Sequence, residues 1–284
     1  MNVFRVLNQR YAPRGAFSFG FRMMTIITLL CGSIGCSTLS NGRGWGQDAF
    51  SKAPPKTISR AAHNAFFDVK TLLPAVAAVV FEASGLGDSV TDWAAEHTPV
   101  FGSQNMADRV SDYLNWTLHT EMVATLLATP SGPEPGPWWR AKAKGLGVEL
   151  MALSATAGTT QLFKELTNRT RPNDEDQRSF PSGHASNAFS LSTLNNRNLD
   201  SIELAPWLRT SLQVSNVLTA SMVAWARVEA DKHFPVDVLT GAALGHFLSA
   251  FIHDAFIGVP ASRRFRLLIW PAKSETMVSI AFSF

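Results

Sequence analysis

Three short segments of the sequence carry side chains suited to chemistry on an oxyanion. The first, KELTNRTRP, contains Lys164, Arg171 and Pro172; the second is Pro181-Ser182-Gly183-His184; the third, ARVEADKHFPVD, contains Arg227, His233 and Asp237. Each segment alone has an ordinary explanation: a solvated helix face, a turn before a helix, or a surface ion pair. Together they supply three cations, two imidazoles and a carboxylate. That set can hold a tetrahedral oxyanion and move protons on and off it.

The spacing of these residues indicates how helices would position them. Lys164 and Arg171 are seven residues apart, so two helical turns would point them the same way, with Pro172 ending the helix. Ser182 and Gly183 predict a helix start whose free N–H groups bind an anion closely. Pro235 suits the first turn of the last helix and places Asp237 there, where the helix dipole favours the ionised carboxylate.

In this order and with these residue types, the three segments resemble the type 2 phosphatidic acid phosphatase (PAP2) superfamily, which includes bacterial acid phosphatases, lipid phosphate phosphatases and vanadium haloperoxidases. The resemblance extends from Lys164 to Asp237. Two features depart from the family pattern. Ala226 stands where the family usually has Ser, and the linker between Pro172 and Pro181 is short and acidic, NDEDQRSF. Its carboxylates would oppose a highly anionic substrate, unless the linker is an ordinary solvated loop.

The resemblance implies a metal-independent phosphatase with no cofactor. His233 would be the nucleophile and form a phosphohistidine, and Asp237 would orient its ring. His184 would protonate the leaving oxygen and then activate water. The phosphoryl oxygens would be held by the remaining motif residues, Lys164, Arg171, Ser182, Gly183 and Arg227. Two alternatives remain at this stage: a vanadate-dependent haloperoxidase built on the same residues, and a non-catalytic envelope lipoprotein whose site binds an anion only.

The rest of the body has the periodicity of helices. We expect them near 57–68, 70–84, 89–97, 103–129, 141–170, 184–195, 208–227 and 235–257. The fold class is therefore all-α, a helical bundle of the PAP2/acid phosphatase type over residues 57–260. The uncharged stretches 150–163, 210–226 and 238–253 are shorter than the ~18 apolar residues of a membrane span, which favours a water-soluble bundle. Residues 261–284 end in an alternating pattern, TMVSIAFSF, which predicts a short C-terminal β-hairpin packed on the domain.

The N-terminus is typical of an exported lipoprotein. Residues 1–36 contain four arginines and no acid, and an apolar run of signal-peptide length ends in Ser33-Ile34-Gly35-Cys36. This resembles a bacterial lipobox, in which Cys36 would carry the lipid anchor. Ser, Gly and Asn then predict a flexible tether over residues 37–56. An uncleaved anchor or an ordinary secretory signal is the alternative. The location expected is the cell envelope, facing the periplasm.

Composition excludes several other classes of protein. The chain is 46% apolar and 17% charged, which does not fit a disordered chain. The two cysteines lie near the N-terminus, so they provide neither a disulfide framework nor a zinc site for the body. Without the leader, 21 basic residues face 22 acidic ones, so we expect no nucleic-acid partner. A phosphorylated lipid and a small phosphomonoester both remain open as the substrate, and the oligomeric state is unspecified.

Overall fold

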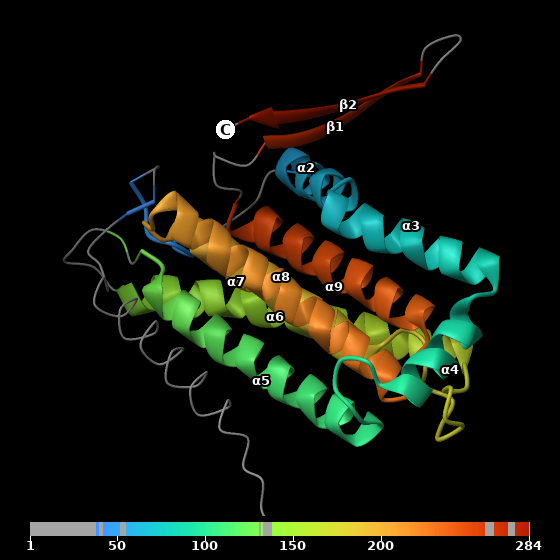
Figure 1. Ribbon diagram of the computed structural model, residues 1–284. Helices are drawn as coiled ribbons and strands as arrows, with labels where there is room; N and C mark the ends of the chain where they lie inside the picture. The colour runs from blue at the N-terminus through green and yellow to red at the C-terminus, as the bar shows by residue number, and fades with distance from the viewer. Residues whose placement is uncertain are drawn as a thin grey trace, which may run out of the picture.

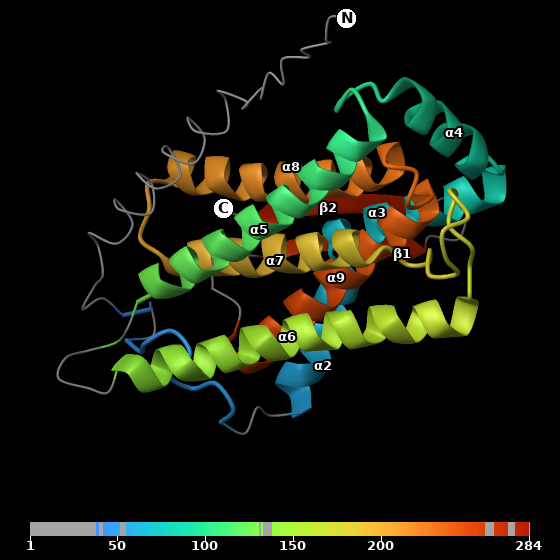
Figure 2. The ribbon, with the colours of Figure 1, turned by 90° about the horizontal axis from the view of Figure 1, so that it is seen from below.

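The protein is a bundle of helices in which one central helix is surrounded by the others. The computed structural model describes residues 38–39, 42–51, 55–130, 132, 138–258, 264–271 and 276–283. Its helices are α2 (Pro55–Phe66), α3 (Val69–Ser84), α4 (Gly87–His97), α5 (Gln104–Ala128), α6 (Trp138–Thr167), α7 (Gly183–Ser201), α8 (Pro206–Glu229) and α9 (Pro235–Phe256). Helix α7 contacts α5, α6, α8 and α9 (Figures 1 and 2). The all-helical fold class predicted for the body is confirmed.

Local signals define where these helices begin. Ser103 caps α5 by accepting a hydrogen bond from the Met106 N–H at 3.2 Å, and Asp68 caps α3 in the same way with the Lys70 N–H at 2.9 Å. Pro206 and Pro235 stand in the first turn of α8 and α9, where the missing N–H costs nothing.

The central helix α7 is buried although its sequence is rich in Asn and Ser. Leu191 and Leu194 enter the main apolar core together with residues of α5, α6, α8 and α9. The polar side chains of α7 find partners inside the bundle: Asn198 donates to Glu149 on α6 at 2.7 Å, and Arg197 pairs with Asp254 on α9 at 2.8 Å. Buried polar groups of this kind are tolerated because they are hydrogen-bonded.

Glycines let α9 approach α7 more closely than any other residue would allow. A Cβ atom at Gly241 would lie 2.7 Å from the Ser182 carbonyl oxygen, and one at Gly245 would lie 2.2 Å from the Ser186 carbonyl oxygen. Both contacts are too short for a side chain, so glycine is required at these two positions. The start of α7 is therefore held against the first turns of α9.

The segment 42–51, inside the predicted flexible tether, packs on the bundle instead. Trp45 is fully buried, and its backbone N–H donates to the Pro130 carbonyl at 2.9 Å. Its ring lies where a side chain at Gly145 of α6 would be. The tether prediction is therefore wrong for these residues. Burial of the Trp45 ring removes apolar surface from water and favours the packed position of this segment.

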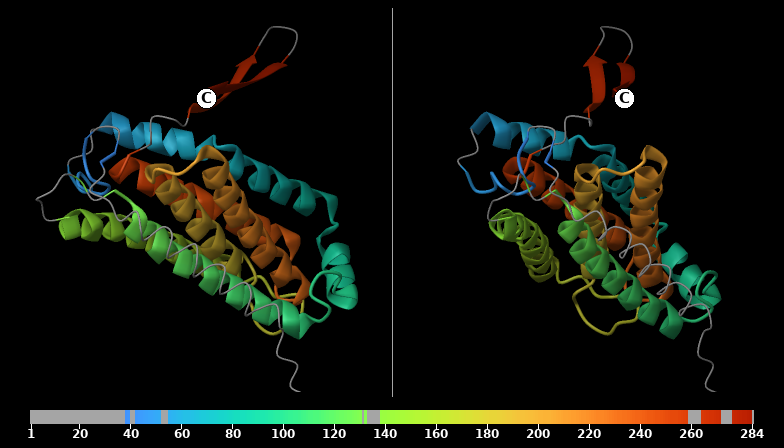
Figure 3. Two further views of the ribbon diagram at one scale, coloured as in Figure 1. Left: turned by 60° about the vertical axis from the view of Figure 1, so that its left-hand side comes forward. Right: turned by 90° about the vertical axis from the view of Figure 1, so that its left-hand side faces the viewer.

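The C-terminal residues form strands β1 (Arg264–Pro271) and β2 (Thr276–Ser283). They pair antiparallel with Arg264 opposite Ser283 and Pro271 opposite Thr276 (Figure 3). The packing of this hairpin on the domain stays a prediction, as do the domain boundaries. The leader 1–36, including Cys36, lies outside the described residues.

Among the residues that the structure describes, one helix, α9, is long and apolar enough to cross a membrane by length and composition, although its uncharged stretch is shorter than a membrane span. Its most apolar window is 67% buried inside the bundle, as in the core helix of a water-soluble domain. Helices α2 and α3 pass the same test only together, with a bend of 49° between them.

Candidate active site

Lys164 and Arg171 approach the site from α6 and from the loop that follows it. Helix α6 ends at Thr167, and Asn168 takes a positive φ of 44°. The predicted continuation of this helix to Arg171 is therefore wrong, because the chain turns before Pro172. Lys164 is buried in the last turn of α6, where its Nζ donates to the Arg178 carbonyl. The loop folds back so that Arg171 still lies near Lys164, and its charge contributes to lowering the lysine pKa.

The start of α7 has the form that the second motif predicts. Ser182 caps the helix through a long contact of 3.4 Å with the Ala185 N–H, and its own N–H donates to the Asp237 carbonyl at 3.0 Å. The position of a Cβ at Gly183 lies 4.0 Å from Lys164 Cε, so the lysine borders this helix start. The N-terminus of α7 and an ammonium group thus lie side by side, an arrangement that favours an anion.

The third motif surrounds the first turn of α9. Asp237 Oδ2 accepts hydrogen bonds from the Phe234 N–H at 3.0 Å and from the Ser179 hydroxyl. His233 Nδ1 lies 3.7 Å from the same oxygen, beyond hydrogen-bond length but within range of a strong electrostatic interaction. Arg169 is also 3.5 Å from Asp237 Oδ1. The carboxylate is thus fixed by the Phe234 N–H and the Ser179 hydroxyl, and it lies near the His233 ring.

Burial controls the protonation of the central groups. Burial lowers the pKa of His233 to about 4, with Asp237 opposing the shift and Arg227 and Arg171 adding to it. Burial, followed by the nearby Arg171 charge, lowers the pKa of Lys164 to about 8. At neutral pH His233 is therefore an uncharged imidazole with a lone pair, and Lys164 is mostly a cation.

His184, also near Arg227, is the more exposed of the two imidazoles. Burial and the Arg227 charge lower the pKa of His184, whereas Asp112 raises it. The Asp112 carboxylate on α5 lies 2.8 Å from His184 Nε2. Burial thus favours the neutral imidazole, and the contact with Asp112 favours the protonated one.

Carboxylates form ion pairs with the arginines of the site. Arg171 Nε donates to Asp176 Oδ1 at 2.7 Å, and Arg227 pairs with Asp108 of α5. Asp176 belongs to the acidic linker, and its neighbour Glu175 pairs with Lys232. The acidic linker therefore supplies internal partners for the site's positive charge, which explains why acidic residues are tolerated beside an anion site.

Sequence reasoning missed the contribution of α5. Asp108 and Ser111 contact Arg227, the serine hydroxyl accepting from the guanidinium at 3.1 Å, while Asp112 contacts His184. Their i, i+3 and i+4 spacing places them on one helix face, but no motif connects that face to residues 70 or more positions later. Ser179 and Arg169, which contact Asp237, lie beside predicted residues without belonging to a motif.

Comparison with known proteins agrees with this arrangement. The sequence model of the PAP2 superfamily matches residues 146–257, a range that contains all the predicted catalytic and substrate-binding residues. The matched range is less than half of the chain, and within it the chain is similar to the PAP2 superfamily. Helix α5 lies outside the matched PAP2 range.

Two known proteins are similar to this chain. A lipid A 1-phosphatase of Porphyromonas gingivalis is 31% identical over 125 residues, which are 43% of this chain and 26% of that protein, so the match spans about a quarter of the relative. The crystal structure of a transmembrane PAP2-type phosphatidylglycerolphosphate phosphatase from Bacillus subtilis aligns with a TM-score of 0.49 at 18% identity. That alignment covers 68% of this chain and 94% of the other.

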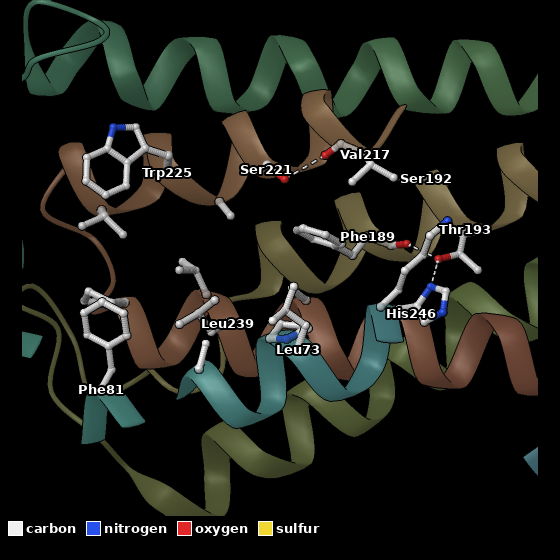
Figure 4. Close-up of a pocket in the computed structure, with 18 of the residues that line it drawn as sticks. Leu73, Phe81, Phe189, Ser192, Thr193, Val217, Ser221, Trp225, Leu239 and His246 are labelled. Atoms are coloured by element: carbon white, nitrogen blue, oxygen red, sulfur yellow. Dashed lines mark hydrogen bonds between the residues drawn. The ribbon is translucent and has the colours of Figure 1, made fainter. Parts of the chain in front are cut away.

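A separate apolar cleft lies between α3, α7, α8 and α9 (Figure 4). Its volume is about 430 Å³, and Leu73, Phe81, Phe189, Trp225 and Leu239 are among the side chains that line it. Pro235 and Val238 place one part of the cleft beside the first turn of α9, although none of the PAP2 motif residues predicted to bind or react lines it. Its chemistry suits a hydrocarbon chain.

The histidines outside the motifs have no partner within a motif, and we interpret them as structural. His246 accepts or donates a hydrogen bond with the Thr193 hydroxyl at 2.8 Å and lies 3.4 Å from Asp68, while His253 lies 3.3 Å from Asp254. These contacts tie helices together and agree with that interpretation. His119 is different, because it lines a second cavity beside His184.

Proposed function

We propose that the protein is a phosphatase that hydrolyses a lipid-linked phosphate monoester through a phosphohistidine, without a metal ion. The observation that carries this proposal is the grouping of Lys164, Arg171 and Arg227 with the start of α7 around two imidazoles. One of these, His233, is kept neutral by burial. Fixed cations and free N–H groups that surround a nucleophile are the requirement for phosphoryl transfer.

In the first step, the neutral His233 ring attacks phosphorus through Nε2 while Nδ1 faces Asp237. The P–N bond forms as the bond between phosphorus and the leaving oxygen breaks, and protonated His184 gives that oxygen its proton. Asp237 stabilises the charge that appears on the His233 ring. The three cations and the Gly183 N–H hold the remaining phosphoryl oxygens.

In the second step, His184, now neutral, takes a proton from water as the water oxygen attacks phosphorus. The P–N bond breaks, and His233 returns to its neutral form as inorganic phosphate leaves. Asp112 contacts His184 from the side of α5 and favours its protonated form, which restores the acid for the next turnover.

A lipid substrate is supported by the surface and by the relatives. Large apolar side chains are exposed along α3, where Leu73 and Val79 are each 68% exposed, and along α8 at Trp207 and Leu218. Such surfaces are typical of contact with a membrane or another apolar partner. The relative from Porphyromonas gingivalis is named for a phosphorylated lipid, lipid A. The cleft in Figure 4 adds an apolar site of the kind that a hydrocarbon chain occupies.

The test is turnover of phosphate esters by His233→Ala, with His97→Ala as the control because His97 is an exposed histidine on α4. We expect the His233 variant to lose hydrolysis of p-nitrophenyl phosphate and of micellar phosphatidic acid, while circular dichroism shows an unchanged helix content. Rapid acid-free quenching of the wild type should trap label from ³²P-substrate on His233. Normal turnover by the variant would rule out the nucleophile assignment.

We also propose that Cys36 is lipidated after export and that the domain faces the periplasm, with the C-terminal hairpin packed on it. The motif at residues 33–36 supports the first part. In bacteria grown with alkyne-labelled palmitate, the wild-type protein should acquire label and Cys36→Ala should not. Equal labelling of both would show that the anchor is elsewhere.

A further inference from the structure

A second cavity opens directly beside His184. Its volume is about 280 Å³, and its walls come from α5 and α7. Asp112, Asn115, Trp116 and His119 form the α5 side, and Gly183, His184 and Asn187 form the α7 side. Ligand pockets commonly have volumes of about 300–1000 Å³. This one is therefore the size for a single small group.

The position of this cavity defines its relation to the reaction. Gly183 belongs to the helix start that would hold the phosphoryl group, and His184 is the acid that would protonate the leaving oxygen. Both residues also line the cavity. With these roles, the group attached to the leaving oxygen lies at this cavity.

The lining combines polar side chains with an aromatic surface. The Asn187 amide donates to Asn115 Oδ1 at 3.1 Å, and the Asp112 carboxylate lies beside His184. Trp116 is 72% exposed, with its ring 5.7 Å from that of His119. A carboxylate and two amides can accept and donate hydrogen bonds to hydroxyl groups, while an indole face covers C–H groups.

We propose that this cavity binds a hydroxyl-bearing ring, of the saccharide or cyclitol kind, as the leaving group of the phosphate ester. The inference rests on the proposed phosphatase function and specifies its substrate class. Such a ring offers hydroxyls at its edge for Asn187 and Asp112 and a C–H face for Trp116. An unsubstituted hydrocarbon ring would form no hydrogen bonds with these groups and would cover part of their remaining hydrogen-bonding capacity.

The experiment compares phosphate esters whose leaving group carries a hydroxylated ring with esters whose leaving group carries none. One pair is free, inositol 1-phosphate against cyclohexyl phosphate. The other is presented in mixed micelles, phosphatidylinositol 4-phosphate against phosphatidic acid. We expect the wild type to prefer the hydroxylated member of at least one pair by about tenfold or more in kcat/KM. The pair with the larger preference identifies whether the ring is free or lipid-borne.

Variants of the wall test which residues produce the preference. Asn187→Ala should reduce it about tenfold, and Asn187→Leu should reverse it towards cyclohexyl phosphate. Trp116→Ala should raise KM for both ring esters. Trp207→Ala is the matched control for the free ring esters, because Trp207 is a 71% exposed tryptophan on α8 that does not line the cavity, and it should leave the values for these soluble esters unchanged.

Equal kcat/KM within both pairs, or a preference that the Asn187 and Trp116 variants retain, would overturn the inference while leaving the phosphatase proposal intact. If p-nitrophenyl phosphate is also not hydrolysed by the folded wild type, both proposals fail. The Trp116 variant retains a test if Asn187 variants do not fold, since an exposed side chain contributes little to stability.

Discussion

Replacement of Asp176 by asparagine should increase the affinity of the site for phosphate esters. In the structure this carboxylate accepts the Arg171 Nε–H at 2.7 Å, and hydrogen bonding by Arg171 holds the pKa of Asp176 below its usual range. The Asp176 carboxylate is therefore ionised at working pH. It pairs with Arg171, which the proposed function assigns to binding of the phosphoryl group. A phosphate ester must displace Asp176 before it can use Arg171.

The size of the effect follows from the exposure of the pair. The side chain of Arg171 is 16% exposed and that of Asp176 is 39% exposed. Solvent-screened pairs of this kind contribute about 0.2–1 kcal/mol, and the half-buried arginine places this one in the upper part of that range. Loss of a competing interaction of about 0.5–1 kcal/mol corresponds to a KM lower by about two- to fivefold. Asparagine keeps an oxygen for the Arg178 N–H, which Asp176 also accepts at 2.8 Å.

The assay is the initial rate of phosphate ester hydrolysis at several ionic strengths. Asp176→Asn should lower KM with little change in kcat, and the difference should shrink as salt screens the ion pair. Glu175→Gln is the control, because this neighbouring carboxylate pairs with Lys232 rather than with a motif residue. An unchanged or higher KM in Asp176→Asn, or the same decrease in the control, would refute the competition argument.

Three further predictions follow from the site and its support. Because Lys164 loses its proton as pH rises through a pKa of about 8, kcat/KM should fall above that pH, and Lys164→Arg should show a smaller fall in the same pH–rate profile. Asp237→Ala should lower kcat and destabilise the protein by about 1–3 kcal/mol in urea unfolding, because buried hydrogen-bond donors lose their acceptor; Asp237→Asn should destabilise it less. Gly245→Val should lower the Tm strongly, since its Cβ would meet the Ser186 carbonyl oxygen at 2.2 Å, whereas Gly158→Val, with nothing within 4 Å, should have a small effect.

The motif residues were predictable because their chemistry is concentrated at helix ends. Ser182 and Asp237 are in the first turns of α7 and α9, where caps and dipoles leave clear signals in the sequence. Arg171 was placed wrongly on α6 because a seven-residue spacing looks helical, although Asn168 adopts a left-handed conformation that ends the helix. The structure reaches the same proximity to Lys164 through a loop.

The residues of α5 could not be predicted because their roles depend on tertiary contacts alone. Asp108 and Asp112 are ordinary charges on an amphipathic helix until packing brings them to Arg227 and His184. The polar α7 presents the opposite difficulty. Asn198 and Arg197 are polar residues that would be expected on the surface. They are buried because Glu149 and Asp254 on neighbouring helices provide their hydrogen-bond partners.

The short glycine contacts between α7 and α9 have a consequence for how such an enzyme can change. The start of α7, with His184, and the start of α9, just after His233, are packed against each other. The close contact at Gly241 and the hydrogen bond from the Ser182 N–H to the Asp237 carbonyl hold them together. The opposite wall, with Trp116, belongs to α5, which shares none of those fastenings. A substitution at Trp116 can therefore change the proposed leaving-group pocket, provided that Asp108 and Asp112 on the same helix keep their contacts with Arg227 and His184.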